Sequence, residues 1–198
     1  MAIRVTRLFG VPIAVVKVPE TPALKQQFLP EMLRHYEAQD YSKPNLWETD
    51  RIHSSYDADK AKLVINFVEA MPEAYENLLQ QFMKTDRFSV QLWHNVYWTR
   101  EEFQERHHHI PCHLSFIHFL AFDKAEHKAP YFYDPARTIK AYCRHDLLPR
   151  DFWEDKVSIE VNEGDAIVFP SYLEHFVPPG KYSKPRVTVA MNVTLFGG

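Results

Sequence analysis

Three adjacent histidines, His107, His108 and His109, are the residues of this sequence best suited to metal chemistry. In an extended strand the side chains at positions i and i+2 leave the same face, so His107 and His109 can reach one point while His108 faces away. Neutral imidazole binds iron, zinc, copper or nickel, and a ligand pair on one rigid strand loses little freedom when a metal binds. A solvated strand end would explain the same histidines without a metal, so the decision rests on the sequence downstream.

The segment between Gly164 and His175 favours the metal interpretation. It contains a turn, an apolar run over residues 166–169, a proline and then His175. This order predicts a barrel strand that delivers His175 from its rim toward the interior. The sequence therefore predicts one metal site formed by His107, His109 and His175.

Arg186 opens the next predicted strand, and ten residues separate it from His175. The Pro-Pro-Gly sequence at residues 178–180 predicts a bend that returns this strand antiparallel beside the one before His175. Arg186 and Thr188 share a strand face, so we expect both to point into the cavity that holds His175. An arginine that merely begins a strand at the surface is the alternative.

The first part of the chain predicts elements that support such a barrel. Residues 8–18 are rich in β-branched side chains and predict a strand. Residues 23–38 carry apolar side chains at helical spacing, and a second helix is expected to begin near Pro72. The apolar stripes of both helices are expected to face the core.

From Arg87 onward the apolar pattern changes from a helical to a strand period. The predicted strands cover residues 88–98, 114–122, 131–133, 157–161, 166–169 and 187–195. Helices followed by strands predict an α+β fold with an antiparallel barrel or double sheet packed on helices. We expect a single domain over residues 1–198, with a strand and supporting helices in residues 1–86 and the barrel core in residues 87–198.

Composition argues against several classes of protein. A net charge of −3 and an isoelectric point near 6.4 provide no general attraction to nucleic acid or anionic membranes. We find neither a secretory signal nor an apolar run long enough to span a bilayer. The two cysteines, Cys112 and Cys143, are too few for a disulfide framework. We therefore expect a cytoplasmic protein, in the host cytoplasm if a phage encodes it, with no nucleic-acid or membrane partner; a homodimer stays open.

The order of these motifs resembles that of iron(II)- and 2-oxoglutarate-dependent oxygenases with a double-stranded β-helix fold. His107-x-His109, His175 and Arg186-x-Thr188 resemble their H-x-D/E, H and R-x-S/T pattern. The chain is similar in more detail to the phage- and bacteria-associated prolyl-4-hydroxylase-like branch. Each short segment that they share is weak evidence alone, and the order and spacing of the segments together make the resemblance specific. The segments that carry this second resemblance are Asn95-Val96-Tyr97, Gln104, Leu114-Ser115, Asp134-Pro135, Phe169-Pro170-Ser171 and Val177-x-Pro179.

The resemblance implies a jelly-roll or cupin-like barrel with N-terminal helices packed on it. It also implies that His107 and His175 bind iron(II). Arg186 would then hold the distal carboxylate of 2-oxoglutarate, for which a planar guanidinium is well suited.

Weaker parts of the resemblance concern three more residues. Thr188 and Tyr97 would add hydrogen bonds to that carboxylate, and Asn95 would contact the other end of the cosubstrate. The implied activity is a prolyl-hydroxylase-like dioxygenase that couples 2-oxoglutarate decarboxylation to hydroxylation. Its substrate would be a small molecule or a peptide.

One position departs from the usual family pattern, because His109 stands where most members have a carboxylate. Three neutral imidazoles leave the iron site one charge more positive than two imidazoles with an aspartate. The similar branch also carries H-x-H, which favours His109 as the third ligand. Asp134 is the reserve candidate, although an aspartate before proline is more often part of a turn. His94, His113 and His118 are not expected to be ligands, and His118 is expected to be a hydrogen-bonded core residue.

Two other functions stay open at the level of the sequence. The H-x-H pair and the spacing from Gly164 to His175 also resemble the half-motifs of a metal-dependent cupin enzyme, which needs no Arg186. A non-catalytic barrel that binds a ligand or partner is the second alternative. Substrate specificity is expected in loops at the barrel mouth, residues 99–106 and 136–155, but the sequence does not name the substrate.

Overall fold

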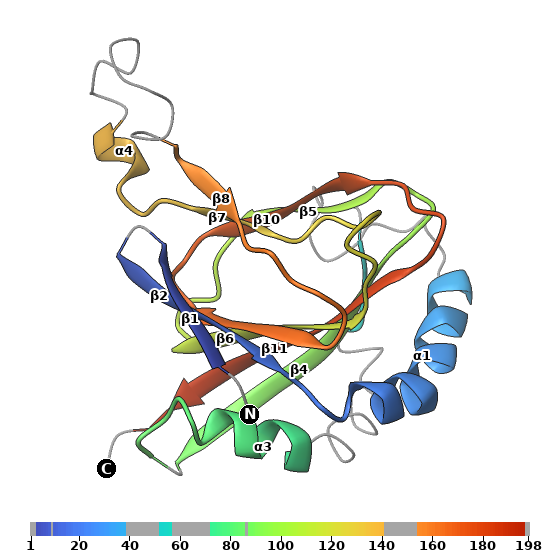
Figure 1. Ribbon diagram of the computed structural model, residues 1–198, viewed down its shortest axis with the longest axis horizontal. Helices are drawn as coiled ribbons and strands as arrows, with labels where there is room; N and C mark the ends of the chain where they lie inside the picture. Colours follow the sequence, from blue (N-terminus) through green and yellow to red (C-terminus); the bar gives the residue numbers. More distant parts are fainter. Residues whose placement is uncertain are drawn as a thin grey trace.

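Two antiparallel sheets face each other in the computed structural model, which describes residues 3–8, 10–38, 52–56, 72–85, 87–140 and 154–196 (Figure 1). The major sheet has seven strands, in the order β1 (Ile3–Leu8), β2 (Val11–Lys17), β9 (Asp165–Pro170), β6 (Leu114–Ala121), β11 (Arg186–Leu195), β4 (Phe88–Tyr97) and β3 (His53–Ser54). The minor sheet has four strands, in the order β5 (Glu102–His107), β10 (His175–Gly180), β7 (Tyr131–Tyr133) and β8 (Lys156–Ser158). This arrangement confirms the expected α+β fold with a double-stranded β-helix.

Hydrophobic side chains fill part of the space between the two sheets. Ile117 and Phe119 of β6 and Phe169 of β9 belong to one buried cluster with Phe132 of β7. The ring centres of Phe132 and Phe169 are 5.0 Å apart and the ring planes meet at 73°, which is an edge-to-face arrangement. This inner cluster joins the major sheet to the minor sheet.

Two helices, α1 (Thr21–Ala38) and α3 (Pro72–Leu79), pack on the outer face of the major sheet (Figure 1). Their apolar side chains share a buried cluster with outward-facing strand residues such as Val189 and Met191 of β11. Both helices lie where the sequence predicts them. Neither these helices nor any other in the described part of the chain is long and apolar enough to cross a membrane.

His118 connects both helices to the major sheet. Its Nε2 lies 2.9 Å from Thr21 Oγ1 at the start of α1, and its Nδ1 lies 2.6 Å from the Tyr75 hydroxyl of α3. Burial, with a smaller contribution from the Lys17 charge, lowers the pKa of His118 to about 3. The side chain therefore stays neutral and is the hydrogen-bonded core histidine that the sequence predicts.

The segment between His175 and Arg186 differs from the expectation. Residues 178–180 do not form a bend but end β10, which pairs with β5 through an irregular register. Proline is tolerated in such an irregular stretch, where the ladder does not use its missing N–H. The chain turns later, over residues 181–185, and β11 enters the major sheet between β6 and β4. The prediction that this strand lies beside β9 is therefore wrong, because β6 separates the two.

The N-terminal part of the chain contributes more than the sequence predicts. β1 pairs with β2 as a hairpin, and β1, β2 and β3 all belong to the major sheet. The first 86 residues thus supply strands to the barrel as well as helices. Residues 102–106 of β5 lie inside the segment expected as the first mouth loop. Of the second mouth loop, residues 141–153 lie outside the described residues.

Candidate active site

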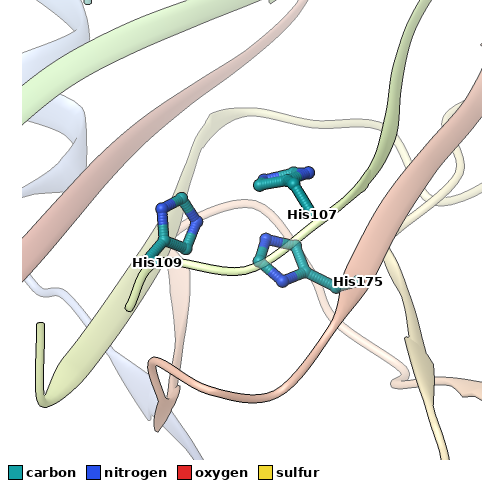
Figure 2. A group of neighbouring side chains, drawn as sticks. All are labelled: His107, His109 and His175. Atoms are coloured by element: carbon teal, nitrogen blue, oxygen red, sulfur yellow. The ribbon is translucent and has the colours of Figure 1, made fainter. Parts of the chain in front are cut away.

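His107, His109 and His175 meet between β5 and β10. His175 begins β10 and is the ladder partner of His107, the last residue of β5, while His109 follows two positions later. The ring centres are 4.3 to 5.1 Å apart, and the three rings surround one point (Figure 2). One nitrogen from each ring lies within 4.8 Å of the others, so the group can hold one metal ion.

Backbone carbonyls orient two of the three rings. Nδ1 of His175 lies 3.0 Å from the carbonyl oxygen of Leu173, and Nδ1 of His107 lies 2.7 Å from that of Glu105. A carbonyl oxygen only accepts, so both bonds place the ring proton on Nδ1 and the lone pair on Nε2. Neutral imidazole with its second nitrogen held in this way is the usual form of a metal-binding histidine.

The protein environment favours the neutral form of His109 and His175. Burial lowers the pKa of His109 to about 3, with smaller contributions from His107 and His108. Burial also lowers the pKa of His175 well below its usual value, and the neighbouring histidines add to the effect. The neutral form carries the lone pair that a metal ion requires. The donor set therefore fits a transition metal such as iron(II).

Asp134, the reserve ligand, is engaged elsewhere. It is not part of the histidine group. Its Oδ1 accepts a hydrogen bond of 2.8 Å from the backbone N–H of Ala136, and its Oδ2 pairs with Lys140. The first bond closes the turn expected for an aspartate before proline. His113 also lies outside the group, since its Nδ1 accepts a hydrogen bond from the backbone N–H of Leu195.

Four other predicted residues lie on the inner face of β4 and β11. The ladder between these strands pairs Arg186 with Tyr97 and Thr188 with Asn95. All four side chains are buried, and all line one cavity together with the three histidines. Strand alternation explains the arrangement, because the intervening Val187 turns outward into the helix-covered cluster.

Arg186 is a buried cation whose N–H donors are only partly used by the described residues. It is 0% exposed, and its guanidinium carbon lies 4.3 Å from the ring centre of Tyr97 and 5.8 Å from that of Phe119. Burial lowers the pKa of Arg186, while Tyr97 and Tyr182 raise it. Its Nε and Nη1 have no hydrogen-bond partner within the described ranges of the chain. Buried donors without a partner cost roughly 1–3 kcal/mol each, so this position is suited to an anion such as a carboxylate.

The cavity around Arg186 is narrow and leads to a wider one. The side chains leave about 20 Å³ open in the inner cavity, whereas the outer cavity has a volume of about 410 Å³. Trp93, Gln104, His107 and His109 line both. The histidine group therefore lies between the narrow cavity that contains Arg186 and the wider outer cavity.

Three residues of the site received no role in the sequence analysis. Trp93 and Asn192 lie on the inner faces of β4 and β11, beside the predicted residues, so strand alternation was a sufficient signal for both. The Tyr97 hydroxyl donates a hydrogen bond of 3.3 Å to Oε1 of Gln104. Gln104 lies in the part of β5 that the sequence predicts as a mouth loop, so its inward direction was not predicted.

Solved structures that share this fold include several oxygenases. A Pseudomonas putida prolyl-4-hydroxylase superposes with a TM-score of 0.56 at 15% identity, covering 93% of each chain. EvdO2 from Micromonospora carbonacea var. aurantiaca, complexed with 2-oxoglutarate, has a TM-score of 0.64 at 10% identity over 93% of this chain and 86% of that one. A Trichoplax adhaerens prolyl hydroxylase in complex with a hypoxia inducible factor peptide fragment has a TM-score of 0.56 at 11% identity over 92% and 83%. The fold is therefore the double-stranded β-helix of 2-oxoglutarate-dependent oxygenases.

Sequence comparison identifies the family. The family described as "Putative 2OG-Fe(II) oxygenase" matches residues 91–192, just over half of the chain. The chain belongs to this family of iron(II)- and 2-oxoglutarate-dependent oxygenases, as its motifs predict. No curated protein matches the sequence.

Proposed function

We propose that this oxygenase is a hydroxylase whose iron(II) is held by His107, His109 and His175 and whose 2-oxoglutarate is held by Arg186. The observation that carries the proposal is the pair of buried guanidinium nitrogens of Arg186, which have no partner among the described residues and lie in the same cavity as the three histidines. A cupin needs no buried arginine at this position. A non-catalytic barrel needs no metal-binding group beside it.

Arg186 supplies the charge and the geometry for the distal carboxylate. Its planar donors match two carboxylate oxygens, and its buried position keeps water from competing for them. Thr188 follows on the same strand face, and the Tyr97 hydroxyl comes from the paired strand. Thr188 offers a further hydrogen bond to that carboxylate, and the Tyr97 hydroxyl offers another once its proton turns from Oε1 of Gln104 to the ligand. Asn95 beside Thr188 is proposed to contact the other end of the cosubstrate.

The three imidazoles bind the metal without adding negative charge. Iron(II) with 2-oxoglutarate supplies the oxidative chemistry, in which decarboxylation is coupled to hydroxylation. The chain orients the ligands through the hydrogen bonds at Nδ1 of His107 and His175. The inner hydrophobic cluster helps to keep water away from the reacting groups.

The outer cavity is the proposed entrance for the substrate. Tyr56 and Trp93 line it, with ring centres 4.9 Å apart in an edge-to-face contact, and His107 and His109 line it as well. Its volume of about 410 Å³ suits a small molecule or one side chain of a peptide. A peptidyl proline is our proposal for the peptide case, supported by the prolyl hydroxylases among the similar structures.

Anaerobic titration with iron(II) and 2-oxoglutarate tests this function. We expect the visible charge-transfer absorption of a keto acid chelated to iron(II), saturating at one equivalent of each. The same titration with Arg186→Ala should need a much higher 2-oxoglutarate concentration. A parent protein that binds iron(II) but never develops this absorption would refute the proposed cosubstrate site.

A further inference from the structure

A series of hydrogen bonds leads from the buried side of the major sheet to His109. Ser171 Oγ lies 2.9 Å from Ser115 Oγ, which lies 2.9 Å from Oδ1 of Asn192. The amide nitrogen of Asn192 in turn lies 3.3 Å from Nδ1 of His109. Ser115, Ser171 and Asn192 are at most 5% exposed, so the two bonds among them are shielded from bulk water, while the bond to His109 is part-buried.

His109 needs such support more than the other two histidines do. His107 and His175 lie on paired strands, and the β5–β10 ladder fixes their backbone. His109 follows the end of β5, and its backbone N–H donates to the carbonyl oxygen of Ser171 at 2.8 Å. Ser171 and Asn192 thus hold His109 from two directions, one at the backbone and one at the ring.

The donors and acceptors in this series of hydrogen bonds can point in either of two directions. A primary amide has nearly the same shape when its oxygen and nitrogen are exchanged, and a serine hydroxyl both donates and accepts. In one direction Ser115 donates to Oδ1 of Asn192, and Nδ2 donates to Nδ1 of His109. In the other, Nδ1–H of His109 donates to Oδ1 of Asn192, Nδ2 donates to Ser115 Oγ, and Ser115 donates to Ser171 Oγ.

We propose that Asn192 positions the third metal ligand, by accepting the Nδ1 proton of His109 on its Oδ1 and so directing Nε2 of His109 to the metal. This inference rests on the proposed metal site. Only the second proton direction gives His109 a lone pair at Nε2, since the first leaves the ring proton on that nitrogen. Asn192 thereby does for His109 what backbone carbonyls do for His107 and His175.

Metal affinity without cosubstrate tests the role of Asn192. We compare the dissociation constants of zinc(II) by calorimetry for the parent, Asn192→Leu and Asn192→Asp. Leucine removes the acceptor at similar size, and the affinity should fall about tenfold to a hundredfold, the usual effect of losing such a partner. Aspartate can only accept, so the affinity should equal or exceed that of the parent. Gln91 is an exposed residue of the same outer cavity, so Gln91→Glu controls for the added negative charge. Gln91→Glu should change the zinc(II) affinity less than Asn192→Leu does.

Each result has a definite reading. An unchanged affinity in Asn192→Leu, or an equal loss in Asn192→Leu and Asn192→Asp, would overturn the acceptor role while leaving the metal site intact. A parent that binds no zinc(II) would remove the proposed metal site itself, and the inference with it. Thermal unfolding of the metal-free variants shows whether a loss of affinity reflects a loss of fold.

A second measurement needs no variant of Asn192. Long-range proton–nitrogen NMR of the zinc(II) protein distinguishes the two ring nitrogens of each histidine, and His109→Gln assigns the signals of His109. We expect the proton of His109 on Nδ1 and none on Nε2. A proton on Nε2 with metal bound would contradict the proposal.

Discussion

Arg186 lies directly opposite Tyr97 in the ladder between β11 and β4, and its guanidinium carbon is 4.3 Å from the centre of the Tyr97 ring. The aromatic face offsets part of the cost of burying the cation. It leaves the in-plane N–H donors to another group, and Nε and Nη1 have no partner among the residues that the structure describes. Tyr97 therefore supports the guanidinium, and these two donors stay available for the ligand carboxylate that we propose.

Replacing Arg186 with alanine should weaken 2-oxoglutarate binding by about one to two orders of magnitude. Hydrogen bonds to a charged group are worth roughly 1.5–3 kcal/mol, and about 1.4 kcal/mol corresponds to a factor of ten. Metal affinity should change little, because Arg186 ligates nothing. Calorimetry at fixed metal occupancy measures both, with Arg186→Lys as the control that keeps the charge but loses the planar donors. Equal 2-oxoglutarate affinity in parent and alanine variant would reject the assignment.

Replacing His175 with alanine should abolish stoichiometric iron(II) binding while the fold persists. His175 is one of three residues whose ring nitrogens lie within 4.8 Å of one another, and two histidines alone form a weaker site. The exposed His108 provides the matched control, since His108→Ala removes a neighbouring imidazole that is not part of the group. Metal analysis after gel filtration should find iron in the parent and in His108→Ala only. The same iron content in all three proteins would show that the metal binds elsewhere.

His118 should make the fold sensitive to acid. Its pKa is about 3 in the folded protein and about 6.5 in an unfolded chain, so the unfolded state binds the proton first. The stabilisation is complete above pH 6.5 and is lost as the pH falls toward 3, by up to about 1.4 kcal/mol per pH unit.

A variant isolates this contribution of His118 from that of other buried histidines. His118→Leu should unfold more easily at pH 7.5, by about 2–3 kcal/mol, because the hydroxyls of Thr21 and Tyr75 lose their shared partner. Its stability should also depend less steeply on pH than that of the parent. Denaturant unfolding from pH 7.5 to 4.5 measures both effects, with His35→Leu on the surface of α1 as the control. An unchanged pH slope in His118→Leu would contradict the folded-state pKa.

Local periodicity accounts for the parts of the fold that the sequence predicts. The helical spacing of Leu24, Phe28 and Met32 gives α1 directly, and these side chains are buried as expected. Most of β5 was not predicted as a strand, because its residues are mostly polar and half-exposed and show no alternation of apolar residues. β10 was not predicted as a strand, because its two prolines are typical of a turn. The strand order depends on which distant strands pair, and no local pattern contains that information.

Local periodicity likewise predicts some residues of the candidate site and misses the contacts between distant elements. The period of a strand predicted that Arg186 and Thr188 share a face, and both lie on β11 and line one cavity. The same rule predicted His107 and His109 on one strand, but β5 ends at His107, and His109 reaches the cavity from the loop that follows. The contact between Asn192 and His109 joins a strand to a loop 83 positions away in the chain. No spacing rule predicts such a contact, because it depends on the order of strands in the major sheet.

The hydroxyl of Thr188 should contribute to 2-oxoglutarate binding less than Arg186 does. Thr188 is 2% exposed, lines the inner cavity and lies on the same strand face as Arg186. Thr188→Val keeps the shape but removes the hydroxyl, so the affinity for 2-oxoglutarate should fall about tenfold, as expected for one hydrogen bond to a carboxylate. Thr188→Ser keeps the hydroxyl and should bind within about threefold of the parent, since it loses only one methyl group. Calorimetry with the metal site saturated compares the three proteins. Equal affinities in Thr188→Val and the parent would place the carboxylate out of reach of Thr188 and leave Arg186 and Tyr97 as its proposed partners.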